Sequence, residues 1–241
     1  MTKALVISDI FPPVHGGSGR WFWELYSRMS SEEVVVAAGK NGEFSTFDET
    51  HNMTVERLDL ASPEWGIKSV TGLKFYWRTF WQLRKIAKKH QVTEIHCGRC
   101  LPEGVMGYLL SLSLGIPFLC YIHGEDVEAA ALSRELTLVV SRVFKRAKLL
   151  ICNSKNSASL LNAWSVPKEK VRILNPGVDC QQFVPVPSCR DTQAQFNWQD
   201  KKVVLTVGRL QKRKGQDMFI KSLPEIVKKH TDVLYAIVGN G

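Results

Sequence analysis

The sequence predicts a doubly wound α/β domain with a parallel sheet, followed by an incomplete second domain of the same kind. Short apolar runs rich in β-branched residues alternate with helix-like segments, as is typical of strands buried on both faces of a parallel sheet. Six such runs are expected as strands of the first domain, which spans residues 1–175, and they cover residues 4–8, 34–38, 94–97, 118–122, 149–152 and 171–174.

A stretch with little periodicity, residues 176–200, is expected as a linker because it combines prolines with polar residues. The α/β alternation restarts in residues 201–241, where strands are expected over 203–207 and 233–238 and a helix over 215–229. Two strands and one helix leave most of their apolar surface without a partner. We therefore expect this segment to be the truncated start of a second domain.

The composition is that of an ordinary globular protein: 44% of the 241 residues are hydrophobic and 23% are charged. No apolar run reaches the roughly 18 residues needed to span a bilayer. The N-terminus enters an apolar run directly, without the longer segment and cleavage site of a secretory signal. We therefore expect a cytoplasmic protein whose six cysteines are reduced.

The formal net charge of +9 can attract nucleic acid, anionic lipid or a phosphorylated ligand, and composition alone does not choose among them. Nucleic acid is not expected as a partner, because the sequence has no zinc-finger spacing, no aromatic RNA-binding motif and no long run of arginine and lysine.

A glycine-rich turn, with Gly16 and Gly17 at its centre, follows the first expected strand and precedes a helical pattern. Small residues and a helix N-terminus together suit a phosphate group. The alternative is a tight turn in which glycine relieves strain. The dinucleotide fingerprint fails at Phe22, the second strand ends in Gly39-Lys40 without an acidic residue, and a Walker A lysine is absent, so a nicotinamide enzyme and a P-loop ATPase are disfavoured.

Two further segments can carry chemistry. His123 follows the strand expected over 118–122, at the carboxyl end where open α/β sheets bind ligands, and can orient or polarise a hydroxyl. A structural histidine is the alternative. The turn after the strand at 203–207 carries four cations, of which Arg209 and Lys214 can clamp a diphosphate. A solvated basic loop is the alternative there.

With these segments in place, the sequence resembles the retaining glycosyltransferases of family 4, which have the GT-B fold of two Rossmann-like domains. The matching motifs cover essentially the whole chain and are Phe11-Pro12-Pro13 with Gly16-Gly17, His123-Gly124, Asn175-Pro176-Gly177-Val178-Asp179 with Phe183, Gly208-Arg209-Leu210 with Lys214-Gly215, and Gly239-Asn240-Gly241.

The resemblance implies a role for each matching position. Gly16 and Gly17 face the donor phosphates, Arg209 and Lys214 neutralise the leaving nucleoside diphosphate, and His123 lies beside the transferred sugar. The resemblance also implies retention of configuration without a metal or other cofactor. The family's Glu-x7-Glu motif lies beyond the last residue of this chain, so we expect the 241-residue polypeptide to have little or no transferase activity.

The segment from residue 73 to residue 89 is expected to form a helix whose Leu73, Trp77, Phe80 and Leu83 or Ala87 pack inward. A second stripe then contains Lys74, Arg78, Trp81, Lys85 and Lys88. A basic face with a tryptophan suits an anionic membrane surface, so a peripheral position on the inner face of the membrane is one reading. A solvated basic helix is the other.

Three functions remain in competition. The leading hypothesis is a transferase that moves a hexose from a nucleotide-sugar donor to a glycan or lipid-linked acceptor. The alternative is a non-catalytic module that binds an acceptor or a membrane. A nucleotide-sugar epimerase has little support, because the Tyr-x3-Lys pair fails at Glu125. A redox or zinc role for Cys97 and Cys100 also has little support, because no second CxxC is present.

Overall fold

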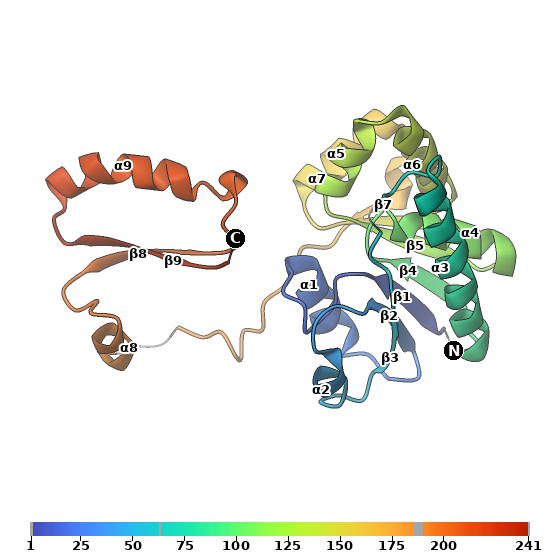
Figure 1. Cartoon of the computed structure of the whole chain (residues 1–241), viewed down its shortest axis with the longest axis horizontal. Helices are drawn as coiled ribbons and strands as arrows, with labels where there is room; N and C mark the ends of the chain where they lie inside the picture. Colours follow the sequence, from blue (N-terminus) through green and yellow to red (C-terminus); the bar gives the residue numbers. More distant parts are fainter. Residues whose placement is uncertain (1, 63, 186–189, 241) are drawn as a thin grey trace. The chain divides into compact units, whose positions relative to one another are not determined.

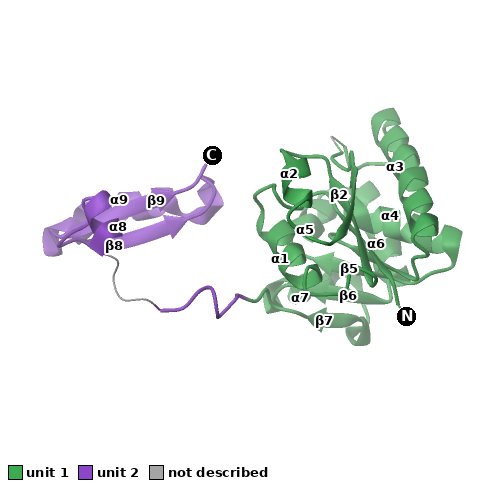
Figure 2. Cartoon of the chain, turned by 90° about the horizontal axis from the view of Figure 1, so that it is seen from below, with its two compact units in different colours: residues 1–177 green, residues 178–241 purple. Residues whose placement is uncertain are grey.

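The computed structural model describes residues 2–62, 64–185 and 190–240, and it contains two compact units, Met1–Gly177 and Val178–Gly241 (Figure 2). Each unit is described by itself below. Residues 186–189, within the segment expected as a linker, lie outside the described residues, as does Gly241 of the last glycine motif.

The first unit contains a seven-stranded sheet in which every neighbouring pair is parallel, in the order β3-β2-β1-β4-β5-β6-β7 (Figure 1). The doubly wound α/β prediction is therefore confirmed, and all six predicted strands are present. The strand at the β3 edge was not predicted. The strands are β1 Ala4–Ser8, β2 Val34–Gly39, β3 Thr54–Leu58, β4 Glu94–Cys97, β5 Phe118–Ile122, β6 Leu149–Cys152 and β7 Val171–Ile173.

Helices cover both faces of this sheet because successive strand side chains point to opposite sides. On one face, Trp21, Phe22 and Tyr26 of α1 pack against Val6 of β1. On the other face, α3, α4 and α6 pack against Leu5 and the neighbouring strands. The helices are α1 Gly17–Tyr26, α2 Phe44–Asp48, α3 Val70–Lys89, α4 Glu103–Leu114, α5 Glu125–Ala131, α6 Arg134–Arg146 and α7 Lys155–Leu160, with 3-10 turns at Leu161–Trp164 and Lys168–Lys170.

Helix α3 is rotated relative to the prediction. Leu73 and Trp77, which were expected to pack inward, are 60% and 66% exposed, so that part of the prediction is wrong. The buried stripe instead contains Gly72, Phe75, Tyr76, Thr79, Leu83, Ile86 and Ala87. Both the predicted and the observed stripe contain apolar residues, so helical spacing alone does not indicate which of them is buried. The N-terminus fixes the choice: the Ser69 hydroxyl accepts a hydrogen bond from the Gly72 amide at 2.9 Å, and the Tyr76 hydroxyl donates to the Trp65 carbonyl at 2.9 Å.

The second unit has two parallel strands, β8 Lys202–Val207 and β9 Val233–Val238, joined by helix α9 Gln216–Lys229 (Figure 1). These elements match the two strands and the helix expected there. Phe219 of α9 packs on Tyr235 of β9, with ring centroids 4.3 Å apart. A short helix, α8 Arg190–Gln195, lies within the segment expected as a linker. Across the described part of the chain, no helix combines the length and the apolarity that a membrane span requires.

Candidate functional site

The glycine-rich turn connects the carboxyl end of β1 to the N-terminus of α1. A Cβ atom on Gly16 would lie 2.6 Å from the Ile10 side chain, and one on Gly19 would lie 2.7 Å from the Ile10 carbonyl oxygen. Packing therefore requires both glycines. Gly17 is different, because it is exposed and a Cβ there would meet no described atom within 4 Å. Among the described residues, no side chain caps the α1 N-terminus, so its first amide groups remain open to a ligand.

His123 lies at the carboxyl end of β5, where its imidazole is held in one orientation. Its Nε2 is 2.8 Å from the Gly98 carbonyl oxygen. Because a carbonyl only accepts, Nε2 carries the proton and Nδ1 of the neutral ring is an acceptor. Burial lowers the pKa of His123, which favours the neutral ring. Trp21 and Phe22 of α1 contact the imidazole at centroid distances of 5.9 Å each, so the helix that follows the glycine turn reaches the same sheet edge.

Asp126, which the sequence analysis did not select, ties the His123 loop to the neighbouring strand. One carboxylate oxygen accepts the His123 and Gly124 amides at 3.3 and 3.1 Å. The other oxygen accepts the Cys100 amide at 2.9 Å. The side chain is buried, so these three backbone groups have a partner that water cannot replace. Asp126 therefore positions the loops after β4 and β5 relative to each other.

An ion pair that the sequence analysis also missed lies at the carboxyl ends of β1 and β4. Glu103 is 2% exposed, and its Oε1 is 3.4 Å from Arg99 Nε and accepts the Asp9 amide at 3.1 Å. Burial raises the pKa of Glu103 to about 7, while the Glu103 carboxylate raises the pKa of Arg99. The second oxygen, Oε2, is buried and has no hydrogen-bond partner among the described residues. Arg99 lies just after β4 and Glu103 begins α4, so two opposite charges close together after a strand are the signal that could have revealed the pair.

These residues surround the point at which the sheet reverses its winding. From β1 the chain proceeds outward to β2 and β3, and then returns to β4 on the other side of β1. In such sheets, the loops after the two central strands diverge and ligands bind in the crevice between them. Asp9 follows β1, Arg99 follows β4 and His123 follows β5. The first unit thus brings His123 and the α1 N-terminus to the edge where the ligand is expected.

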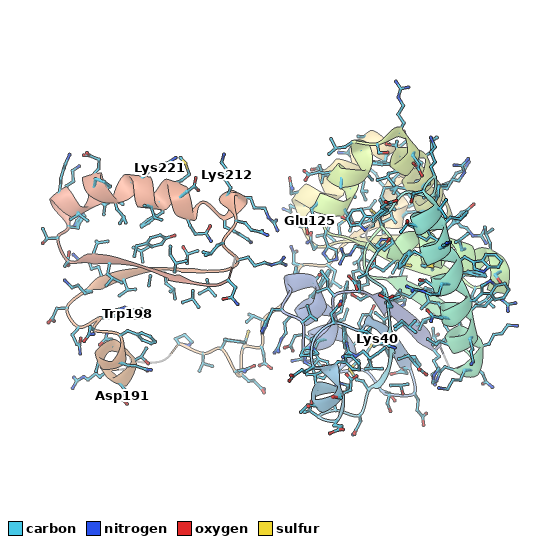
Figure 3. All side chains as sticks on the ribbon, viewed as in Figure 1. Lys40, Glu125, Asp191, Trp198, Lys212 and Lys221 are labelled. Carbon is cyan, nitrogen blue, oxygen red and sulfur yellow. The ribbon has the colours of Figure 1, made fainter. Side chains whose placement is uncertain are left out.

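Arg209 and Lys214 lie in the second unit, on the exposed loop between β8 and α9; Lys212 of the same loop is labelled in Figure 3. The loop is held by hydrogen bonds to its backbone. The Arg209 carbonyl accepts a hydrogen bond from the Gln216 side chain at 3.0 Å, and the Leu210 amide donates to the Asn240 carbonyl at 2.9 Å. A Cβ on Gly239 would lie 1.9 Å from the Gly208 carbonyl oxygen, so the ends of β8 and β9 approach too closely for any other residue.

Cys97 and Cys100 are both completely buried, with free thiols whose pKa values are raised by burial. They contribute to the apolar core beneath the strand ends. In the described ranges, no three His, Cys, Asp or Glu side chains are grouped closely enough to hold a metal ion.

A parallel sheet with polar residues at its switch point places this chain among the Rossmann-like α/β proteins, which bind their ligands at that edge. Residues 15–182 match the family model described as Glycosyltransferase Family 4, and residues 190–241 match the one described as Glycosyl transferases group 1. The chain belongs to glycosyltransferase family 4. The resemblance found in the sequence is thereby confirmed.

Individual proteins are similar to this chain in sequence or in fold. A GDP-mannose-dependent α-(1-6)-phosphatidylinositol monomannoside mannosyltransferase from Mycolicibacterium smegmatis is 25% identical over 244 residues, which cover 98% of this chain and 60% of that protein. The chain thus spans about 60% of the length of this curated relative. The crystal structure of Anabaena Alr3699/HepE with UDP and glucose superposes with a TM-score of 0.77 at 19% identity, over 100% of this chain and 62% of that one.

The same fold also occurs in enzymes of another class. UDP-GlcNAc 2-epimerase from Methanocaldococcus jannaschii has a TM-score of 0.60 at 12% identity, over 97% of this chain and 65% of that one. Likeness of fold therefore does not select the reaction, and the family match carries that part of the argument.

Proposed function

We propose that this protein transfers a hexose from a nucleotide-sugar donor to a glycan or lipid-linked acceptor with retention of configuration. The observation that supports the proposal is the family match along both units, within which the glycine turn, His123 and the Arg209–Lys214 loop lie. The sugar-nucleotide bond breaks toward a diphosphate, so the protein must stabilise negative charge that grows during the reaction.

The residues of each unit divide this task. The guanidinium of Arg209 and the ammonium of Lys214 offer the leaving diphosphate two exposed cations, which would supply without a metal the charge that a divalent ion supplies elsewhere. The uncapped amides behind Gly17 offer hydrogen bonds to phosphate oxygens. The neutral His123 ring, with Nε2 engaged by Gly98, presents Nδ1 to a hydroxyl of the transferred sugar.

Loss of either cation should weaken nucleotide binding. We expect Arg209→Ala and Lys214→Ala each to reduce the affinity for UDP or GDP by about tenfold, because each removes a charge-assisted contact to the diphosphate. Isothermal titration calorimetry of the 241-residue chain measures this directly. Lys221→Ala, which removes an exposed cation on α9 (Figure 3), is the matched control and should bind as the wild type does.

Two outcomes count against the Arg209–Lys214 loop as a diphosphate site. If neither nucleotide binds the wild type, or if Lys221→Ala weakens binding as much as Arg209→Ala, then the loop is not a specific diphosphate site. The alternative of a non-catalytic module would gain support if nucleotides failed to bind while an acceptor or a membrane was bound.

The exposed face of α3 supports a second part of the proposal, peripheral association with an anionic membrane surface on the cytoplasmic side. Trp77 and Trp81 are 66% and 47% exposed, with ring centroids 5.6 Å apart. Exposed Lys74, Arg78 and Lys85 lie on the same helix. Paired indoles between cations match the apolar and charged layers of a lipid headgroup region. The rotation of α3 places two tryptophans on this face instead of the one expected.

Vesicle co-sedimentation tests whether the exposed face of α3 binds a membrane. We expect the double variant Trp77→Ala, Trp81→Ala to bind vesicles containing anionic phospholipid at least about tenfold more weakly, because it removes two exposed indoles that would insert into the lipid headgroup region. Lys85→Glu should weaken binding only for anionic vesicles, because it replaces a cation that contributes about 1 kcal/mol near the surface with an anion that the lipid repels. Lys221→Glu makes the same charge change on α9 and should have little effect. Equal binding by the wild type and the double tryptophan variant would remove the membrane proposal.

A further inference from the structure

An open hollow lies between helices α4 and α6, away from the residues of the candidate site. It has a volume of about 350 Å³ and is lined by Tyr108, Arg142, Lys145 and Arg146. Helix α4 ends just before β5 and α6 ends just before β6, so the hollow lies toward the edge of the sheet at which these strands begin. The glycine turn and His123 lie at the opposite edge, where the strands end. The hollow is therefore separate from the candidate site.

The two walls of this hollow are held together by close packing and by hydrogen bonds. A Cβ atom on Gly104 of α4 would lie 3.0 Å from the Val143 side chain of α6. The buried Ser111 of α4 accepts two hydrogen bonds from the Arg146 guanidinium, one at its hydroxyl from Nε at 3.1 Å and one at its carbonyl from Nη2 at 3.3 Å. These bonds leave Nη1 for a ligand. Arg146 is thus oriented in advance, which lowers the entropy cost of binding.

The three cations of the hollow have no carboxylate partner among the described residues. Helix α9 shows the usual alternative, because its Lys228 pairs with Glu225 at a spacing of three residues. In α6 the same spacing brings like charges together, since Arg142 precedes Lys145 and Arg146 by three and four residues. The helix dipole accounts for the two cations in the last turn but not for Arg142. The positive charge is therefore concentrated without compensation.

The chemistry of the lining favours a phosphate group as the ligand. Tyr108 is half-buried, and its hydroxyl has no hydrogen-bond partner in the described part of the chain. Guanidinium, ammonium and phenol groups are all donors, and together they exceed what the two oxygens of a carboxylate can use. A phosphate monoester offers three strong acceptor oxygens and about two negative charges at neutral pH. The volume is at the lower end of the range of about 300–1,000 Å³ that is typical of small-ligand sites.

We propose that this hollow binds a phosphate monoester group. Arg146 supplies an oriented guanidinium, and Arg142 and Lys145 supply further charge. Tyr108 supplies a neutral donor. The site goes beyond the proposed transfer reaction and does not depend on it. The phosphate can belong to a soluble phosphorylated compound or to a lipid headgroup, because both present the same oxygens to the protein.

The test is titration of the 241-residue chain with inorganic phosphate and with glycerol 3-phosphate, followed by NMR of the arginine Nε–Hε groups. We expect the Arg142 and Arg146 resonances to shift saturably, whereas sodium chloride at the same ionic strength should not shift them. Arg142→Ala and Arg146→Ala should each weaken binding about tenfold, because a charge-assisted contact is lost. Tyr108→Phe should weaken it about threefold, since a neutral hydrogen bond contributes less. Arg134→Ala, which removes an exposed cation from the other end of α6, is the matched control and should bind as the wild type does.

The resolution by residue separates this site from the proposed diphosphate loop, because Arg209 has its own resonance. A shift at Arg209 with none at Arg142 and Arg146 would overturn the inference and leave the proposed function intact. A shift at Arg142 and Arg146 with none at Arg209 would support the inference, whatever the outcome for the transferase. Equal shifts with sodium chloride, or unchanged affinity in an Arg146→Ala variant that circular dichroism shows to be folded, would also overturn the inference.

Vesicles distinguish the two sources of the phosphate. Helix α4 packs against both α3 and α6, so a headgroup in the hollow would be one helix away from the exposed tryptophans of α3. Vesicles with phosphatidic acid, a monoester, are compared with phosphatidylglycerol vesicles of equal surface charge. Weaker binding of Arg146→Ala to phosphatidic acid alone would support the site and assign it to a lipid. Unchanged vesicle binding by a variant that has lost glycerol 3-phosphate binding would support the site and assign it to a soluble compound.

Discussion

Replacing Asp126 with alanine should destabilise the first unit by about 4 kcal/mol, because three backbone amides lose their acceptor and each buried unpaired donor costs about 1–3 kcal/mol. The three amides belong to Cys100, His123 and Gly124, and two of these hydrogen bonds are fully buried. Water cannot enter readily to replace a side chain that is 3% exposed. Urea unfolding followed by circular dichroism measures the loss.

Two companion variants test whether the lost hydrogen bonds cause the loss of stability. Asp126→Asn keeps the shape but offers one accepting oxygen instead of two, so we expect a loss smaller than that of alanine. Glu128→Ala removes an exposed carboxylate from the same helix, α5, and should change stability by less than about 0.5 kcal/mol. If Asp126→Ala lowers the free energy of unfolding no more than Glu128→Ala does, then the three hydrogen bonds do not stabilise the loops. The His123 ring resonances should also shift in Asp126→Ala, because its loop is no longer fixed.

The parallel sheet was largely predictable because burial on both faces imposes a nearly uninterrupted apolar run. β4, β5 and β6 have the predicted boundaries, since each run is bounded by polar or small residues. The strand β3 was not predicted, for the opposite physical reason. It is an edge strand with every residue half-buried, and its Glu56 and Arg57 break the apolar pattern. An edge strand needs a hydrophobic contact on only part of its surface, so its sequence carries little signal.

The candidate site was predictable where chain order alone decides position. His123 follows a strand directly, so its place at the carboxyl edge of the sheet follows from the parallel topology. Its role remains a prediction. The links that Asp126 and Glu103 make between loops were not predictable in this way, because the Cys100 and Asp9 amides that they bind lie 26 and 94 residues away along the chain. Only the packing of β1, β4 and β5 reveals that buried carboxylates connect these loops. The predicted buried face of helix α3 was wrong for a third reason. Aromatic residues lie on both of its faces, so the sequence does not show which face packs against the sheet.

Replacing Glu103 with glutamine should remove a pH dependence from the stability of the first unit. Burial raises the pKa of Glu103 from its ordinary value of 4.5 to about 7. Between these values, the folded protein keeps a proton that the unfolded chain has released. The contribution of Glu103 to the free energy of unfolding is therefore full below about pH 4.5 and falls as the pH rises, by about 3 kcal/mol by pH 7. Glutamine does not titrate, so the variant should become more stable relative to the wild type over that range.

The measurement is a series of urea titrations of both proteins between about pH 5 and pH 8. Other groups titrate in this range, including His123, whose lowered pKa acts in the opposite direction, but they are common to both proteins and cancel in the difference. Glu169→Gln, at an exposed position, is the matched control, and its difference from the wild type should stay constant. Curves for wild type and Glu103→Gln that run parallel across the range would mean that Arg99 keeps Glu103 ionised in the folded protein. In that case, the ion pair of Arg99 with Glu103 would persist across this pH range.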